Sequence, residues 1–157
     1  LYCALIPEKR FDFILQKCTE IGVTSCTPVI TERCVAQFKE NKLQRWRRIC
    51  DGAARQCGGP PMHIAAPLSL DDTHASATGC MIIADGRGEE YTCAQLPGES
   101  VSLLIGPEGG FNHNEYTQAC TAGWIPLRFH PHTLRVETAA VVCATLLQHH
   151  LHTHKET

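Results

Sequence analysis

Apolar side chains recur at helical spacing along two stretches of the chain. In the first, residues 8–22, they are Phe11, Ile14, Leu15, Cys18 and Ile21. Gly22 then follows as a common helix stop signal. The second stretch, 41–57, places apolar residues on one face and arginines on another, and the Gly-Gly-Pro-Pro run at 58–61 ends it. Both stretches predict amphipathic helices.

Shorter apolar runs predict four strands, at 23–31, 80–84, 101–105 and 124–129. The runs at 80–84 and 101–105 are almost uninterrupted, which is typical of strands covered on both faces in a parallel sheet. Pro28 is expected near the end of its strand, where a missing amide does least harm.

Two further helices are predicted in the second half of the chain. One covers residues 114–121, where Asn112 and Glu115 have the spacing of a capping box at its start and Gly123 follows its end. Residues 137–148 are apolar on nearly every side, which predicts a buried helix. Because strands, loops and helices alternate, the sequence predicts an open α/β sheet that binds its ligand beyond the carboxyl ends of the strands.

The composition fits one globular domain. The 157 residues are enough for one core and few for two, and 43% of them are hydrophobic and 19% charged. No apolar run approaches the roughly 20 residues that span a bilayer, so no membrane helix is expected.

Ten cysteines are present, and none forms a C-x-x-C pair of the kind that binds zinc. Several fall where a helix favours a small apolar side chain, so we expect reduced core cysteines in a cytoplasmic protein. Those at helical positions are Cys18, Cys50, Cys57, Cys120 and Cys143.

Charge is spread unevenly along the chain. The formal net charge of −2 argues against a protein that binds nucleic acid over its whole surface. Residues 39–55, however, carry six basic side chains and two acidic ones. Arg45, Arg48 and Arg55 share one face of the predicted helix there, so they are candidates for contacts with RNA phosphates. An ordinary solvated helix surface is the alternative interpretation.

Three stretches follow predicted strands and are expected to meet at one site: 85–90, 106–112 and 130–139. The second contains three glycines and Glu108. It matches neither glycine-rich phosphate motif, and Glu108 would repel a phosphate. The loop therefore suits a cationic or amine-bearing ligand better, although a plain glycine turn entering a helix remains an alternative.

Histidines are numerous but do not predict a metal site. His130 and His132 flank a proline beside the third stretch and lack further ligands. The four histidines at 149, 150, 152 and 154 are interpreted as part of a polar terminal tail.

Four motifs in the same order resemble one known family. They are "QKCTEIGVTSCTPVITER" at 16–33, "RWRRICDGAARQC" at 45–57, "LLIGPEGGFNHNE" at 103–115 and "TLRVETA" at 133–139. Together they resemble the C-terminal domain of the RsmE-type 16S ribosomal RNA (uracil(1498)-N3)-methyltransferases of the SPOUT superfamily. The resemblance covers residues 1–157 as one methyltransferase domain, without the amino-terminal PUA-like barrel that usually precedes it.

The resemblance implies a mostly parallel sheet whose last strands and loops form a deep trefoil knot, a rare exception among folds. It implies S-adenosylmethionine as cofactor, 16S ribosomal RNA or the small ribosomal subunit as partner, and a homodimer. The implied cofactor-binding residues are Ile105, Gly106, Glu108, Gly109, Gly110, Phe129, Leu134, Thr138 and Ala139.

Methylation of uridine N3 by such an enzyme needs stabilisation of negative charge on the base. Arg135 is the candidate, because a guanidinium offers paired donors to carbonyl oxygens. Glu137 is the second catalytic candidate, either as general base or as the residue that orients Arg135. Glu108 is expected to face the cofactor's cationic groups or to cap the adjoining helix.

The chain departs from the family pattern at His130 and at Gly58 and Gly59. A non-catalytic RNA- or ribosome-binding module with the same fold is therefore a competing hypothesis. A nucleotide-binding α/β protein is a third, and it predicts affinity for ATP or GTP.

Overall fold

The computed structural model describes residues 1–34, 36, 38–92, 96 and 100–153. The strands are β1 (Tyr2–Ala4), β2 (Ser25–Ile30), β3 (His63–Ile64), β4 (Leu68–Ser69), β5 (Cys80–Glu90), β6 (Val101–Ile105) and β7 (Ile125–Arg128). The helices are α1 (Glu8–Ile21), α2 (Asn41–Cys57), α3 (Leu70–Ser76), α4 (His113–Thr121) and α5 (Val136–Thr153).

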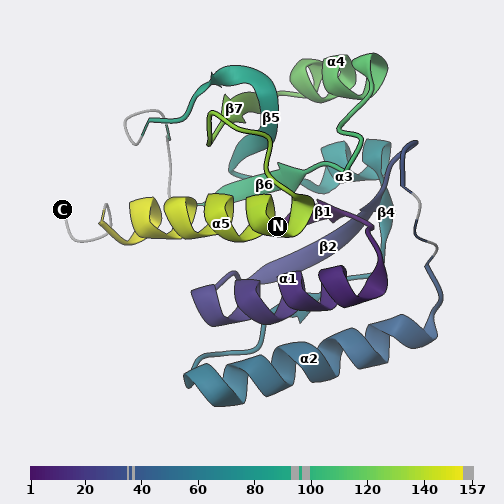
Figure 1. The fold of residues 1–157 in the computed structure, drawn as a ribbon, viewed down its shortest axis with the longest axis vertical. Helices are drawn as coiled ribbons and strands as arrows, with labels where there is room; N and C mark the ends of the chain where they lie inside the picture. The colour runs from purple at the N-terminus through teal and green to yellow at the C-terminus, as the bar shows by residue number, and fades with distance from the viewer. Residues whose placement is uncertain (35, 37, 93–95, 97–99, 154–157) are drawn as a thin grey trace.

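The strands form one sheet in the order β3-β2-β1-β6-β5-β7, and β4 also pairs with β2. Every described pairing is parallel. Helices α1, α2 and α5 lie on one side of the sheet, and α3 and α4 lie on the other (Figure 1). The predicted α/β class with a mostly parallel sheet is therefore confirmed.

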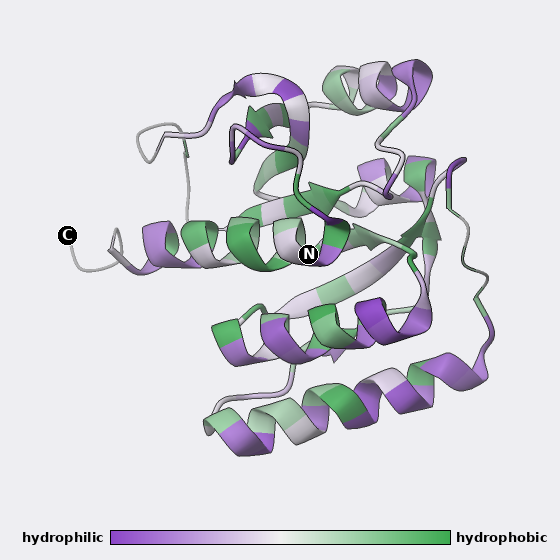
Figure 2. Ribbon diagram, in the orientation of Figure 1, coloured by the Kyte–Doolittle hydropathy of each residue, from purple (hydrophilic) through white to green (hydrophobic). Residues whose placement is uncertain are grey.

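Side chains of successive strand residues enter two separate cores, because neighbouring residues of a strand point to opposite faces. Ile82 packs with α1, α2 and α5, whereas Ile83 packs with α3 and α4. Both are fully buried. In Figure 2, α5 is largely hydrophobic, whereas hydrophobic and hydrophilic stretches alternate along α2.

Helix α5 differs from its prediction, because only one of its faces is buried. The buried side chains lie three or four residues apart, and Leu146 is 36% exposed. The expectation of a helix buried all round is therefore wrong. The helix also continues to Thr153, so His149, His150 and His152 lie on α5 rather than in a terminal tail. His150 is buried, whereas His149 and His152 are exposed, as predicted for a polar segment. His154 lies outside the described residues.

The predicted loop at 85–90 is also wrong, because β5 continues to Glu90. Ala84 and Glu89 both pair with Leu127, so the residues between them form a bulge. In this bulge, residues 85–88, the regular pairing of β5 with β7 is interrupted. The bulge begins just after Ala84, which pairs with Ile105 at the end of β6. A loop was predicted because Asp-Gly-Arg-Gly is typical of turns. The strand that pairs beyond this segment, β7, is distant in sequence, so the local pattern could not indicate the pairing.

Pro28 occupies the middle of an internal strand rather than its end. On one side β2 pairs with β3 at Ser25 and Cys26, and then with β4 at Val29 and Ile30. The proline falls in the gap between these two short strands. The missing amide therefore removes no hydrogen bond from that side of the ladder.

Two cysteine positions depart from the expected core. Cys57, the last residue of α2, is exposed, and Cys120 in α4 is half-buried. The other cysteines in the described residues are free thiols that are buried, apart from the half-buried Cys34. Among the described residues, no helix combines the length and apolar character needed to cross a bilayer.

Candidate functional site

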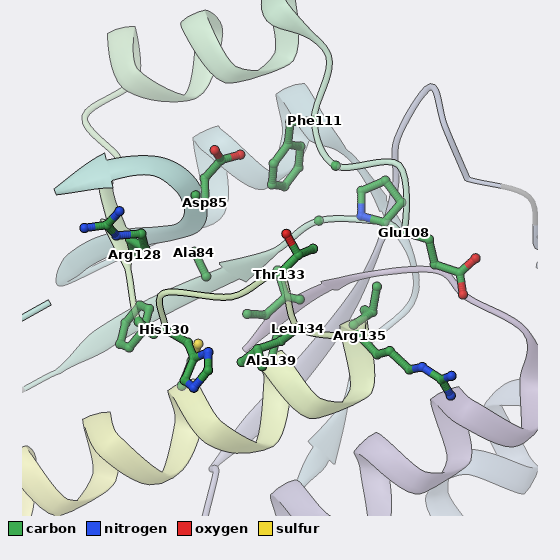
Figure 3. A pocket seen from close by; sticks show the side chains of 18 of the residues that line it. Ala84, Asp85, Glu108, Phe111, Arg128, His130, Thr133, Leu134, Arg135 and Ala139 are labelled. Carbon is green, nitrogen blue, oxygen red and sulfur yellow. The ribbon is translucent and has the colours of Figure 1, made fainter. Parts of the chain in front are cut away.

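A cavity of about 1050 Å³ opens beyond the carboxyl ends of β5, β6 and β7. Three segments from different strand ends line it, as predicted, at 84–87, 105–111 and 127–136. Arg10, Ala139 and Cys143 complete the lining. Figure 3 shows Asp85 and Phe111 on one side of this space and His130, Leu134 and Ala139 near the start of α5 on the other.

The cavity floor is apolar. Ile105, Leu127 and Val136 are each less than 5% exposed. Burial also raises the pKa of Cys143 to about 12, so this thiol stays protonated at neutral pH and does not act as a nucleophile or metal ligand. In the residues that the structure describes, no group of three or more metal-ligating side chains is placed to hold an ion.

The glycine loop, residues 106–111, forms one wall. A Cβ at Gly106 would lie 2.8 Å from the ring of Phe111, and Gly110 has a φ of 66°, so side chains are disfavoured at both positions. The loop ends in the predicted capping box. Asn112 accepts from the amide of Glu115, and Glu115 accepts from the amide of Asn112. Glu108 therefore does not cap α4.

The bulge in β5 supplies a second wall. Asp85 accepts hydrogen bonds from Nε and Nη2 of Arg87 at 2.8 and 2.7 Å. The Arg87 guanidinium also lies over the Tyr116 ring, 3.8 Å from its centroid. Burial opposes ionisation of Asp85, but the hydrogen bonds from Arg87 outweigh it and hold the pKa of that carboxyl below its ordinary value.

A third feature joins the glycine loop to the start of α5. Arg10 donates from Nε and Nη2 to Glu137 at 3.1 and 2.7 Å, and its Nη1 pairs with Glu108. Hydrogen bonds from Arg10 hold the pKa of Glu137 below its ordinary value. The expectation that Glu137 orients Arg135 is therefore wrong, since Glu137 is hydrogen-bonded to Arg10.

The structure brings most predicted cofactor residues to this cavity. Those that line it are Ile105, Gly106, Glu108, Gly109, Gly110, Phe129, Leu134 and Ala139, and the catalytic candidate Arg135 lines it too. Thr138 is exposed on α5 and lies outside the lining, as does Glu137. Their helical positions turn them away while Ala139 faces the cavity.

His130, one of the positions where the chain departs from the family pattern, does not block the cavity. The side chain is exposed at the rim, and its Nδ1 accepts a hydrogen bond from the His132 amide at 3.1 Å. The ring is thus held by its own loop rather than by the apolar floor.

The three arginines of α2 lie away from the cavity, because α1 separates α2 from α5 (Figure 1). Arg45 pairs with Glu8 and Asp12 of α1. Arg48 and Arg55 are exposed. The structure therefore gives Arg45 a role in helix packing and leaves the other two on the surface.

The sequence reasoning missed four polar residues of the cavity wall: Arg10, Asp85, Arg87 and Arg128. The signal for Asp85, Arg87 and Arg128 was their position at strand ends, where ligands of α/β proteins bind. Arg10 carried no comparable signal, since it lies in the first turn of a surface helix.

Comparison with known proteins gives a consistent result. A family model for an RNA methyltransferase domain matches residues 1–148. The chain is 34% identical to the ribosomal RNA small subunit methyltransferase E of Synechocystis, and 32% identical to that of Buchnera aphidicola from Acyrthosiphon pisum. Each match covers 90% of this chain, but the chain spans only 50% and 59% of the two relatives.

A similar solved structure is that of the ribosomal RNA small subunit methyltransferase E from Neisseria gonorrhoeae, bound to S-adenosylmethionine. It aligns with a TM-score of 0.87 at 28% identity, over 94% of this chain and 64% of that one.

Proposed function

Because this chain belongs to the RNA methyltransferase domain family, as its resemblance to the RsmE type indicated, we propose that it catalyses S-adenosylmethionine-dependent methylation of ribosomal RNA. The observation that carries the proposal is the cavity built from the three strand-end segments, with an apolar floor, a glycine loop and charged walls. The specific target that we propose is N3 of uridine 1498 in 16S ribosomal RNA of the small subunit.

The residues present fit the cofactor. Its adenine suits the apolar floor formed by Ile105, Leu127 and Val136, and the backbone of the glycine loop can approach a ligand closely. Asp85 and Glu108 offer negative charge to the cationic groups of the molecule. When bound, S-adenosylmethionine supplies an electrophilic methyl group on a sulfonium.

The role of Arg135 follows from its position and charge. It lines the cavity with an exposed side chain, and it makes no ion pair among the residues that the structure describes. Its guanidinium is therefore available to hold the oxygens of a uracil as they gain negative charge. Orientation of the base by the same donors would contribute further.

Glu137 is poorly suited to be the general base. Hydrogen bonds from Arg10 lower the pKa of its carboxyl, which makes it a weaker proton acceptor. Asp85 is held in the same way by Arg87. We therefore assign Glu137 to the placement of Arg10 rather than to proton transfer.

Calorimetry with S-adenosylmethionine tests the proposal. We expect micromolar binding to the protein, and binding at least about tenfold weaker in Gly106→Val, because a branched side chain must displace Phe111 or enter the cavity. Gly52→Val is the control, since Gly52 lies on α2, away from the cavity, with its nearest neighbour atom 3.9 Å from an added Cβ.

Absence of binding by the folded protein would favour the non-catalytic RNA-binding module. Binding of ATP or GTP instead would favour the nucleotide-binding alternative.

Arg48 and Arg55 are our proposed phosphate contacts, because both are exposed and lie seven residues apart on one face of α2. We expect the double charge reversal Arg48→Glu/Arg55→Glu to weaken binding to 16S ribosomal RNA by about tenfold or more at moderate salt. Its affinity for S-adenosylmethionine should not change, which serves as the internal control. Filter binding that finds RNA affinity unaltered would remove both residues from the interface.

We further infer a homodimer and a C-terminal trefoil knot. Leu146 on α5 and Phe13 on α1 are exposed apolar side chains on two helices that pack together, which supports a second copy covering this face. For the knot, the support is that β7 lies beyond β5 while α5 returns to pack on β6. A ribosomal substrate would place the protein in the cytoplasm.

A further inference from the structure

The exposed part of the glycine loop has little support of its own. Glu108 and Gly109 are exposed and lie outside any helix or strand. Within the loop, one turn hydrogen bond joins the Gly110 amide to the carbonyl of Pro107, at 2.8 Å. A surface segment with so few contacts is expected to be mobile unless other parts of the molecule hold it.

Arg10 holds the loop from α1. Its guanidinium binds Glu108 of the loop and, through two further donors, Glu137 in the first turn of α5. The Glu137 side chain is 16% exposed, whereas that of Glu108 is 51% exposed. The Glu137 contact therefore fixes the guanidinium, and the Glu108 contact transmits that position to the loop.

Arg33 holds the next residue of the loop from the segment after β2. Its Nη1 donates to the carbonyl of Gly109 at 2.6 Å. The adjacent Glu32 is anchored to the start of α4, since its amide donates to Glu115 at 2.8 Å and its carboxylate accepts from Asn112 at 2.5 Å. Arg33 lies outside the residues that line the cavity.

We propose that Arg10, at the edge of the cavity, and Arg33, outside it, are positioning residues that clamp the glycine loop at the distance from the 129–135 loop that the cofactor requires. The inference deepens the proposed function and rests on it. Arg10 acts through the two carboxylates, and Arg33 acts through a backbone carbonyl. The Arg10 contact with Glu108 and the Arg33 contact with Gly109 are exposed, and exposed polar contacts add little to global stability, so their loss should loosen the loop without unfolding the protein.

The first test is cofactor affinity. Arg10→Met keeps the apolar stem and removes the guanidinium, and we expect the dissociation constant for S-adenosylmethionine to rise about tenfold. KM for the cofactor should rise with it, while kcat at saturating cofactor changes little. Arg10→Lys should recover part of the affinity, because an ammonium can reach one carboxylate.

A double-mutant cycle identifies the partner. Glu108→Gln should also weaken binding, both through the loop and through loss of its charge toward the cofactor. The combined loss in Arg10→Met/Glu108→Gln should be smaller than the sum of the two single losses, because the loop contact is lost only once. Arg45→Met is the matched control. Arg45 also joins two carboxylates of different residues, Glu8 and Asp12, and is similarly exposed, but it lies away from the cavity. It should leave cofactor affinity unchanged.

Hydrogen exchange of the ligand-free protein separates this proposal from the proposed function. In Arg10→Met and Arg33→Met, amides at 108–111 should exchange faster, while those of α2 keep their protection. Unchanged exchange and unchanged affinity would overturn the clamp. Faster exchange in a protein that does not bind S-adenosylmethionine would instead support the clamp and refute the methyltransferase assignment.

Discussion

Replacement of Gly88 by alanine is expected to destabilise the protein by about 2–3 kcal/mol, the range seen when atoms are forced into a packed interior. An added methyl group would overlap the backbone of Pro126 and would lie 2.6 Å from the nitrogen of Leu127. Neither contact can be relieved by a side-chain rotation, because both partners are main-chain atoms of β7. The pairing of β5 with β7 must therefore shift.

Chemical denaturation measures this effect, and Gly86→Ala is the matched control. Gly86 lies in the same bulge, and an added Cβ would meet no atom within 4 Å, so its unfolding free energy should change by about 0.5 kcal/mol or less. If both variants lost the same unfolding free energy, the cost would come from the backbone conformation of the bulge. The close contact of Gly88 with β7 would then be unimportant.

The elements that were predicted well are those whose signal is local. The helical spacing of Phe11 to Ile21 and the stop at Gly22 define α1, and Gly22 indeed adopts a left-handed φ of 92°. The capping box of Asn112 and Glu115 is also present as expected. In both cases the interacting atoms belong to residues close together in sequence. The local sequence pattern is therefore enough to predict the interaction.

Four short elements were missed because the pattern is too brief to be informative. β1 has three residues, β3 and β4 have two each, and α3 has seven. The helix did carry a local start signal, since Ser69 accepts a hydrogen bond from the Asp72 amide at 3.1 Å. β1 carried none, and its place in the middle of the sheet depends on pairing with β2 and β6.

The partners of charged side chains could not be predicted at all. Arg10 and Glu137 are 127 residues apart, and no spacing rule relates them. Arg135 is the nearer arginine in sequence, but it precedes α5, and the hydrogen bonds of Glu137 come from Arg10. Only the packing of α1 beside α5 brings Arg10 to Glu137. This contact assigns Glu137 to the placement of Arg10, in place of the two predicted roles, general base and orientation of Arg135.

The three irregular segments of the chain meet at one edge of the sheet. The bulge 85–88, the glycine loop and the 129–135 loop each follow a regular strand, and each departs from regular structure where the cavity begins. Regular strand pairing ends at this edge because a binding site needs backbone groups and polar side chains that are free to contact a ligand. In a paired strand, the backbone groups already hydrogen-bond to the neighbouring strand. The failure of prediction at 85–90 thus falls at the site itself, and the failure at Glu137 falls beside it.

Replacement of Arg135 by glutamine is expected to lower kcat for RNA methylation by about 100- to 1000-fold, the range found when a donor to a developing oxyanion is removed. Glutamine retains one donor and loses the positive charge and the paired geometry. Cofactor affinity should change less than about threefold, because Arg135 is assigned to the base rather than to the cofactor. The kcat of Arg135→Lys should lie between those of the unaltered protein and of Arg135→Gln, since lysine restores the charge alone.

Single-turnover methylation of 16S ribosomal RNA with labelled cofactor measures the effect directly, and Arg128→Gln provides the comparison. Arg128 lines the same cavity and is similarly exposed, but its guanidinium lies 3.8 Å from Glu90, so part of its charge is already compensated. Loss of the Arg128 guanidinium should lower the rate of methylation by about tenfold or less. Equal losses in the two variants would mean that the cavity needs positive charge in general, whereas a larger loss in Arg135→Gln assigns the stabilisation of the uracil anion to that guanidinium.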